Sequence, residues 1–251
     1  MATAKDLHVA PISSHDAREL VRRIHYSGKV ASNSQLHFGV FFDGKLEGVM
    51  QFGPSLDKRK IQGIVSGTGW NDFIELNRMA FSEALPRNSE SRALSVAFRL
   101  IRKHYPHIEW VVSFADGTQC GDGTIYRASG FVLTSIKKNT TMLLMPDGSI
   151  VADKTLNNSN NMGKNGRSGS SIAKEQGAKP IIGFQLRYIY FLNPAARERL
   201  TVPILPFSKI GEMGASMYRG EKITRTKEQD AGYPPALGGV TPTRSLQTSN
   251  N

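Results

Sequence analysis

The chain has 251 residues but only one cysteine, Cys120, and no apolar run near the ~20 residues needed to span a membrane. A single cysteine excludes an internal disulfide and is typical of a reducing, intracellular setting. The first residues, MATAKDLHVAPISS, lack the basic-then-apolar layout of a secretion signal. We therefore expect no membrane association and a cytoplasmic location.

Acidic residues are also scarce relative to basic ones. Asp and Glu number 21 against 32 Lys and Arg, a formal net charge of +11. Such an excess favours a polyanionic partner, whether nucleic acid, anionic membrane or a phosphorylated cofactor. The last 33 residues contribute only +2 of this charge, so most of it belongs to the part that should fold. Charge alone fits an ordinary basic protein equally well.

Apolar periodicity and turn residues predict one domain of the α+β class. The order of elements indicates a mixed central sheet flanked by helices. Asp43-Gly44 marks a two-residue hairpin turn, and Ser14 is the expected cap of the first helix. Residues 57–69 are polar and are expected to form a loop. The expected elements are a helix (16–24), a hairpin (35–52), a strand (72–81), a helix beginning near residue 89, a strand (108–116), a short helix (124–129) and strand, a second hairpin (140–153), and a strand with a short helix (183–200).

Two stretches have few apolar residues. Residues 157–178 are rich in Asn, Ser, Gly and Lys, and we expect a flexible insertion there. Residues 219–251 are rich in Thr, Pro, Gly and Ser, and we expect a disordered tail. The predicted domain is therefore residues 1–218.

The stretch LPRNSESRA predicts an anion site. It places two arginines and small polar residues just before an amphipathic helix, where unpaired amides and the helix dipole favour phosphate. An ordinary helix start capped by Asn88 or Ser89 is the alternative. The candidate phosphate ligands are Arg87, Asn88, Ser89, Ser91 and Arg92.

The strand, loop and helix around this stretch resemble the GNAT acyltransferase family. In that family a loop of the form [QR]-x-x-G-x-[GA] binds the pyrophosphate of acyl-CoA, and RNSESRA occupies its position. The segment IYRASGF resembles the family's tyrosine helix, which implies that Tyr126 lies at the cofactor and protonates the departing thiolate. The expected glycines are replaced here by Glu90 and Arg92, whose side chains crowd the backbone.

Longer stretches resemble the Mom family, DNA-modification enzymes of Mu-like bacteriophages. They include HYSGKVASNSQLHFGVFFDGKLEGVMQFGPSLDKRK, FIELNRMAFSEALPRNSESRA and WVVSFADGTQCGDGTIYRASGFVLT. The resemblance implies transfer of a methylcarbamoyl (acetamido) group to adenine N6 in double-stranded DNA, as protection against restriction in the host cytoplasm. It also implies a GNAT-like fold, acetyl-CoA and bound iron. A conventional acetyltransferase of protein or aminoacyl-tRNA amines, and a non-catalytic DNA-binding domain, are the alternatives.

Candidate catalytic residues lie where side chains should reach a cleft. His25 and Tyr26 follow the first helix, and a histidine there can act as a base or metal ligand. Arg78, beside Asn77, is a mid-strand charge that requires a pocket or a partner. Asp116 ends a buried strand, and Tyr126 begins the next helix. Packed or exposed structural roles are the alternatives for all five.

The metal evidence from spacing is poor, because the sequence has no H-x-x-x-H or C-x-x-C pair. We name His25 and Asp116 as the iron ligands, with His37 as a weaker candidate. Cys120 has no nearby histidine in sequence and is not expected to be catalytic. The phosphates of DNA are expected to contact Lys58, Arg59, Lys60, Arg102 and Lys103.

Overall fold

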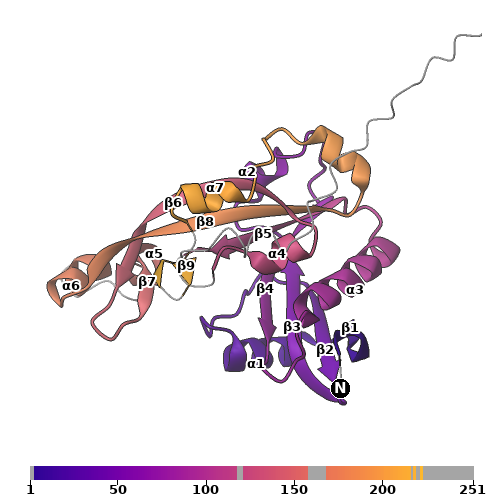
Figure 1. Cartoon of the computed structure of the whole chain (residues 1–251), viewed down its shortest axis with the longest axis horizontal. Helices are drawn as coiled ribbons and strands as arrows, with labels where there is room; N and C mark the ends of the chain where they lie inside the picture. The colour runs from indigo at the N-terminus through magenta and orange to yellow at the C-terminus, as the bar shows by residue number, and fades with distance from the viewer. Residues whose placement is uncertain (1–2, 118–120, 158–167, 216, 219–220, 223–251) are drawn as a thin grey trace, which may run out of the picture.

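A mixed eight-stranded sheet, in the order β1-β2-β3-β4-β5-β8-β6-β7, organises the computed structural model, which describes residues 3–117, 121–157, 168–215, 217–218 and 221–222. Its strands are β1 (His8–Pro11), β2 (Leu36–Phe42), β3 (Lys45–Gly53), β4 (Phe73–Phe81), β5 (Trp110–Asp116), β6 (Val132–Leu144), β7 (Ile150–Ala152) and β8 (Lys179–Phe191). The pair β4 and β5 is parallel and the other pairs are antiparallel (Figure 1). The predicted α+β class is confirmed.

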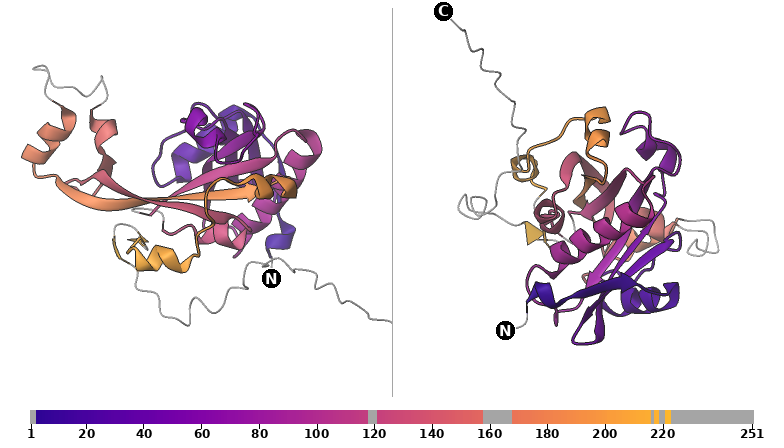
Figure 2. Two further views of the ribbon diagram at one scale, coloured as in Figure 1. Left: turned by 90° about the horizontal axis from the view of Figure 1, so that it is seen from above. Right: turned by 90° about the vertical axis from the view of Figure 1, so that its right-hand side faces the viewer.

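Helices lie on both faces of this sheet (Figures 1 and 2). They are α1 (Ser14–Ile24), α2 (Lys58–Gln62), α3 (Ser89–His104), α4 (Thr124–Ala128), α5 (Asp153–Leu156), α6 (Gly169–Glu175) and α7 (Ser208–Glu212), with 3-10 turns η1 (Ala4–Asp6) and η3 (Pro194–Arg199). A short pair, β9 (Met217–Tyr218) and β10 (Glu221–Lys222), is separate. No helix among the described residues is long and apolar enough to cross a membrane.

Successive side chains of β3 point to opposite faces of the sheet and so identify which helix covers each face. Met50 and Phe52 pack with α3, whereas Val49 packs with α1 on the opposite face. Helix α1 buries Ala17, Leu20 and Val21 against that face, as its periodicity predicted. Its cap is Ser13 rather than the expected Ser14, because the Ser13 hydroxyl accepts the Asp16 N–H.

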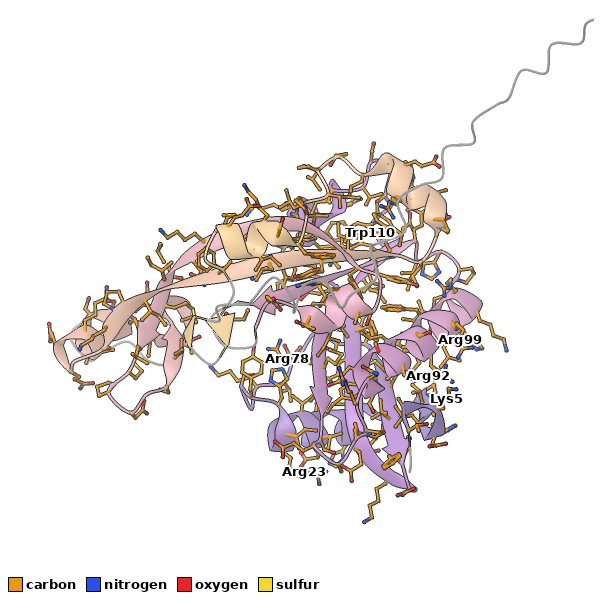
Figure 3. The ribbon with its side chains drawn as sticks, in the orientation of Figure 1. Lys5, Arg23, Arg78, Arg92, Arg99 and Trp110 are labelled. Carbon is orange, nitrogen blue, oxygen red and sulfur yellow. The ribbon has the colours of Figure 1, made fainter. Side chains whose placement is uncertain are left out.

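The first hairpin turns where the sequence predicted. Asp43 and Gly44 have φ values of 48° and 74°, and positive φ at both positions suits a two-residue turn between twisted strands. Besides the apolar clusters under α3 and α1, a third apolar cluster holds α2 and η3 against the sheet around Phe73 and Trp110. These two rings stack at 4.5 Å between centroids. Trp110 is labelled in Figure 3.

The structure contains two helices in segments where the sequence predicted none. Residues 57–69 contain α2, whose Ile61 is buried in the third cluster. The described part of the expected flexible insertion, residues 157 and 168–178, contains α6. Ala173 of this helix and Ala178 after it pack on Leu143. These helices were missed because each has only a short apolar pattern. Strands β6 and β8 extend beyond the rest of the sheet to carry β7, α5 and α6 (Figure 1).

Candidate active site

Strands β4 and β5 separate after a short paired stretch. In their parallel pairing, Phe73 lies opposite Trp110, Ile74 opposite Val111 and Glu75 opposite Val112. Beyond it lies a cavity of about 1090 Å³ between the strands. The end of α1 lines it from one face of the sheet and α4 from the other, so side chains from both faces form its wall. The structure places all the predicted catalytic residues on its wall: His25, Tyr26, Arg78, Asp116 and Tyr126.

A bulge in β4 turns Arg78 into this cavity. Gln51 pairs with Arg78 but the next residue, Phe52, pairs with Leu76, so Asn77 is the extra residue. Leu76 and Met79 consequently share the α3 face, and Arg78 faces the α1 side. Its Nε and Nη1 donate to the carbonyl oxygens of Lys29 (2.9 Å) and Asn77 (2.7 Å), which hold the guanidinium in place. Arg78 is labelled in Figure 3.

His25 lies at the C-terminal end of α1, where its backbone N–H donates to Val21. Its ring contacts Tyr26 at 4.3 Å between centroids. Burial, and secondarily the charge of Arg78, lowers the pKa of His25 to about 4, so the ring is neutral at physiological pH. Its Nδ1 accepts the backbone N–H of Ser27 at 3.2 Å, which places the ring hydrogen on Nε2. The ring is therefore a hydrogen-bond donor towards other groups.

Asp116 and Tyr126 approach the cavity from β5 and α4. Asp116 is the last residue of β5, and the following Gly117 N–H donates to Phe184. The Tyr126 ring packs on Phe131 and Tyr188, at 5.2 Å between centroids in each case. Tyr126 therefore has both the packed role and the cavity-lining role that the sequence left open.

A half-buried carboxylate in the cavity was missed by sequence analysis. Glu75 lies on β4 among the lining residues, and burial raises the pKa of its carboxyl group. Hydrogen bonds with Ser55 and Asn77, and the charge of Arg78, oppose this shift of the Glu75 pKa. The signal was present in FIELNRMAF, where Glu75 and Asn77 are polar residues two apart in a strand with apolar neighbours.

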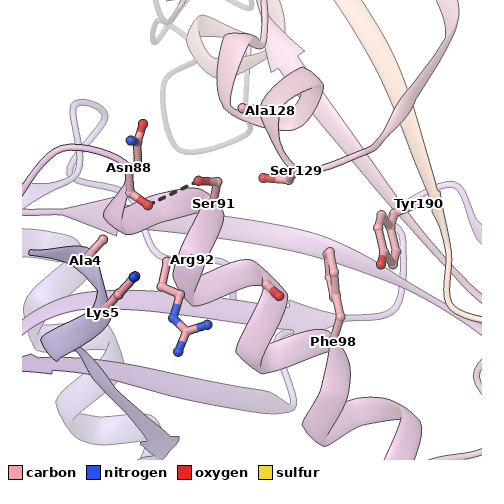
Figure 4. Close-up of a pocket in the computed structure, with 10 residues that line it drawn as sticks. Ala4, Lys5, Asn88, Ser91, Arg92, Phe98, Ala128, Ser129 and Tyr190 are labelled. Atoms are coloured by element: carbon pink, nitrogen blue, oxygen red, sulfur yellow. Dashed lines mark hydrogen bonds between the residues drawn. The ribbon is translucent and has the colours of Figure 1, made fainter. Parts of the chain in front are cut away.

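The predicted phosphate loop borders a second cavity of about 420 Å³ at the start of α3 (Figure 4). Asn88, Ser91 and Arg92 line it, together with Lys5 and Ser129. Ser91 Oγ donates to the Asn88 carbonyl at 3.1 Å. Asn88 has φ 71°, a left-handed conformation that asparagine tolerates better than most residues.

Three predicted cofactor residues lie elsewhere. Ser89 is buried and its hydroxyl donates to the Pro86 carbonyl, and Arg87 lines neither cavity. Tyr126 lines the larger cavity, whereas Ala128 and Ser129 beside it line the smaller one. Helix α4 therefore lies between the two cavities. Of the residues that replace the expected glycines, Arg92 lines the smaller cavity and Glu90 does not.

The donor atoms do not fit the iron site implied by the resemblance. Among the described residues, no three His, Cys, Asp or Glu side chains form a group that could hold a metal ion. His25 and Asp116 share one cavity, but the His25 hydrogen on Nε2 and the nearby Arg78 charge both disfavour a cation there. The weaker candidate His37 is buried beside Gln51. Cys120 lies outside the described residues.

The predicted DNA-contacting cations separate into two groups. Lys60 lines the larger cavity, and Lys58 and Arg59 line an adjacent hollow of about 560 Å³. Arg102 and Lys103 are in the last turn of α3 and line none of these cavities. Of the predicted DNA-contacting cations, those of α2 therefore lie nearest to the candidate site.

Known proteins resemble this chain in sequence and in structure. Residues 6–209 match the model of the Mom protein family. The chain is 38% identical over 203 residues to the methylcarbamoylase mom of Escherichia phage Mu, which covers 80% of this chain and 82% of the relative. Solved structures that resemble it include the ribosomal-protein-S18-alanine N-acetyltransferase of Escherichia coli (12% identity, 74% of this chain and 94% of that chain, TM-score 0.42). Another is an N-acetyltransferase of Staphylococcus aureus Mu50 (9% identity, 74% and 99%, TM-score 0.45). The sequence matches extend over most of the chain, and the protein therefore belongs to the Mom protein family.

Proposed function

We propose that this protein transfers a methylcarbamoyl group to the N6 amino group of adenine in phage DNA and so protects that DNA from restriction in the host cell. Membership of the Mom family and the phage Mu methylcarbamoylase support this activity. The observation that carries the proposal is the cavity of about 1090 Å³ lined by the candidate catalytic side chains. Small-molecule sites span about 300–1,000 Å³, so this cavity is large enough for an extruded nucleobase.

Acetyl-CoA is the proposed donor. Its diphosphate would lie at the start of α3, where first-turn amides, Arg92 and Lys5 offer positive charge. Its thioester would pass α4 to reach the larger cavity from the α3 face. DNA would approach from the opposite face, where α1 ends and α2 begins. The two substrates then meet between β4 and β5.

The residues of the cavity have distinct roles in this proposal. Asp116 accepts the proton that leaves N6, because the His25 ring acts as a donor at Nε2. Arg78 stabilises negative charge that develops on the acetyl oxygen. Tyr126 protonates the thiolate of the departing coenzyme. The transferred group is joined through its methyl carbon, so forming that bond removes two electrons and a proton from the methyl group, and an amide nitrogen replaces the thiolate at the carbonyl. The oxidant and that nitrogen come from other reactants. The residues of the cavity are assigned only to orientation, charge stabilisation and proton transfer.

The test is nucleoside mass spectrometry of DNA from cells that express the protein. The wild type should produce a deoxyadenosine that carries the added methylcarbamoyl mass, and Asp116→Asn should abolish it while DNA binding persists. Asp147→Asn, in the turn between β6 and β7, is the matched control and should behave as wild type. Unchanged DNA together with acetylated protein or aminoacyl-tRNA amines would replace this proposal with a conventional N-acetyltransferase.

A further inference from the structure

We propose that Leu56 is a wedge that enters the DNA duplex and occupies the space left by the extruded adenine. The inference rests on the proposed function and names the residue that makes the buried base accessible. Leu56 is 90% exposed, the highest value among the large hydrophobic residues that the structure describes as exposed. An aliphatic side chain so exposed has no packing role in the isolated protein.

The backbone on both sides of Leu56 is anchored. Before it, Gly53 lies so close to Asn33 that a Cβ would be 2.4 Å from the Asn33 oxygen, and Ser55 is buried. After it, the Asp57 carbonyl accepts the N–H groups of Lys60 and Ile61 at the start of α2. A short segment held at both ends presents the leucine side chain to solvent in a defined position.

Leu56 also lies at the right place for this role. It lines both the larger cavity, with Asp116 and Tyr126, and the adjacent hollow with Trp70. A base that leaves the duplex for the larger cavity would therefore pass beside it. DNA-bending and base-extruding proteins commonly insert an apolar side chain where stacking is lost.

The charge around Leu56 fits a DNA backbone. Lys58, Arg59 and Lys60 follow it after one acidic residue, Asp57. Lys58 lies over the Trp70 ring, with Nζ 4.6 Å from the centroid, and Lys60 pairs with Asp57 at 2.8 Å. An apolar tip followed by three cations suits a duplex, whose stacked bases lie between two rows of phosphates.

Fluorescence of 2-aminopurine tests the wedge without any cofactor. The probe replaces an adenine that the wild type modifies in cells, and its emission rises when the base unstacks. The wild type should raise emission in a fully paired duplex, whereas Leu56→Ala should raise it at least about tenfold less. When the probe lies opposite an abasic site, the emission with the two proteins should differ by less than about twofold. The probe base there is already unpaired, so its extrusion depends less on a wedge.

Three further measurements separate a wedge from a merely structural residue. Leu56→Met should retain the wild-type emission, and Ile182→Ala, which removes an exposed aliphatic side chain outside the cavities, should also behave as wild type. DNA modified by Leu56→Ala in cells should contain at least about tenfold less of the product nucleoside. Circular dichroism should show unchanged folding.

The outcomes distinguish this inference from the proposed function. A wild-type response of Leu56→Ala in both assays would remove the wedge and leave the modification activity standing. Unmodified deoxyadenosine with the wild-type protein would overturn the proposed function, and the wedge with it. Equal loss of emission on paired and abasic duplexes would assign Leu56 to general DNA contact and would also overturn the wedge.

Discussion

At the scale of single residues, the candidate site is governed by three ionisable side chains in one wall. Arg78 lies close enough to His25 and Glu75 for its charge to affect both pKa values. It lowers the pKa of each, whereas burial lowers the pKa of His25 and raises that of Glu75. Burial is the largest cause in both cases and shifts each pKa in the direction that disfavours the charged form. Each shift has a consequence for stability.

The first prediction concerns His25 and pH. The folded-state pKa of about 4 lies below the ordinary value of 6.5, so the unfolded chain binds the proton first as pH falls. Wild-type stability should therefore decrease from about pH 6.5 towards pH 4. Urea unfolding at pH 7 and pH 5 should show the wild type losing roughly 1 kcal/mol more than His25→Gln, a value discounted for partial exposure. Parallel losses would show that His25 is freely protonated.

The second prediction concerns Glu75, where the sign is opposite. A raised folded-state pKa means that stability is lost as pH rises above the ordinary value near 4.5. The free energy of unfolding of Glu75→Gln should therefore exceed that of the wild type by roughly 1 kcal/mol at pH 8. This difference in stability should disappear below about pH 4.5. Thermal unfolding at the two pH values measures it. Glu83→Gln, at an exposed position, is the control, and a similar gain there would refute the assignment.

At the scale of elements, the start of α3 combines sequence features that were predicted with an arrangement that was not. The helix and its polar start were readable from the periodicity of residues 89–104. The sequence did not show that Ser89 would be used internally, since its hydroxyl closes the turn onto Pro86. Nor did it show that Lys5, from the chain's beginning, would share a cavity with Arg92.

The third prediction tests that helix start. Arg92→Ala should weaken acetyl-CoA binding by about fivefold, or about 1 kcal/mol, because an exposed charge-assisted contact is lost. Arg99→Ala, on the same helix but outside the cavity, should bind as the wild type does. Isothermal titration calorimetry compares the variants. Equal affinities for all three proteins would remove Arg92 from the cofactor site.

At the scale of the whole molecule, the sheet separates two approaches to one cavity. The smaller cavity lies on the α3 face, and the α2 cations lie with the end of α1 on the other. Figures 1 and 2 show α1 and α3 on different sides of the strands. This separation would let the proposed DNA and acetyl-CoA contact different sets of cations.

The fourth prediction follows from this separation. Replacing Lys58 and Arg59 together with Gln should weaken DNA binding and reduce the slope of log affinity against log salt by about 2, because two phosphate contacts are lost. The double replacement of Arg102 and Lys103 with Gln removes the same charge at the end of α3 and should leave the slope unchanged. Fluorescence anisotropy across a salt series measures both. Equal changes of the salt slope in the two double variants would indicate that DNA contacts a diffuse basic surface.

The sequence by itself determined the elements whose signals are local: the Asp43-Gly44 turn, the amphipathic faces of α1 and α3, the buried β5 and the α+β class. It also indicated the family, because long matching stretches preserve residue order. It missed α2 and α6, whose apolar patterns are too short to stand out, and it overlooked Glu75, an ordinary strand residue until burial changes its pKa.

Only the tertiary structure decided where the candidate residues meet. His25, Arg78, Asp116 and Tyr126 come from four elements separated by up to 101 positions, and they share a cavity because β4 and β5 part after a short pairing. The bulge at Asn77 then decides which face Arg78 occupies. Neither the separation of two strands nor a one-residue bulge follows from local pattern, because both depend on pairing between residues that are distant in the chain.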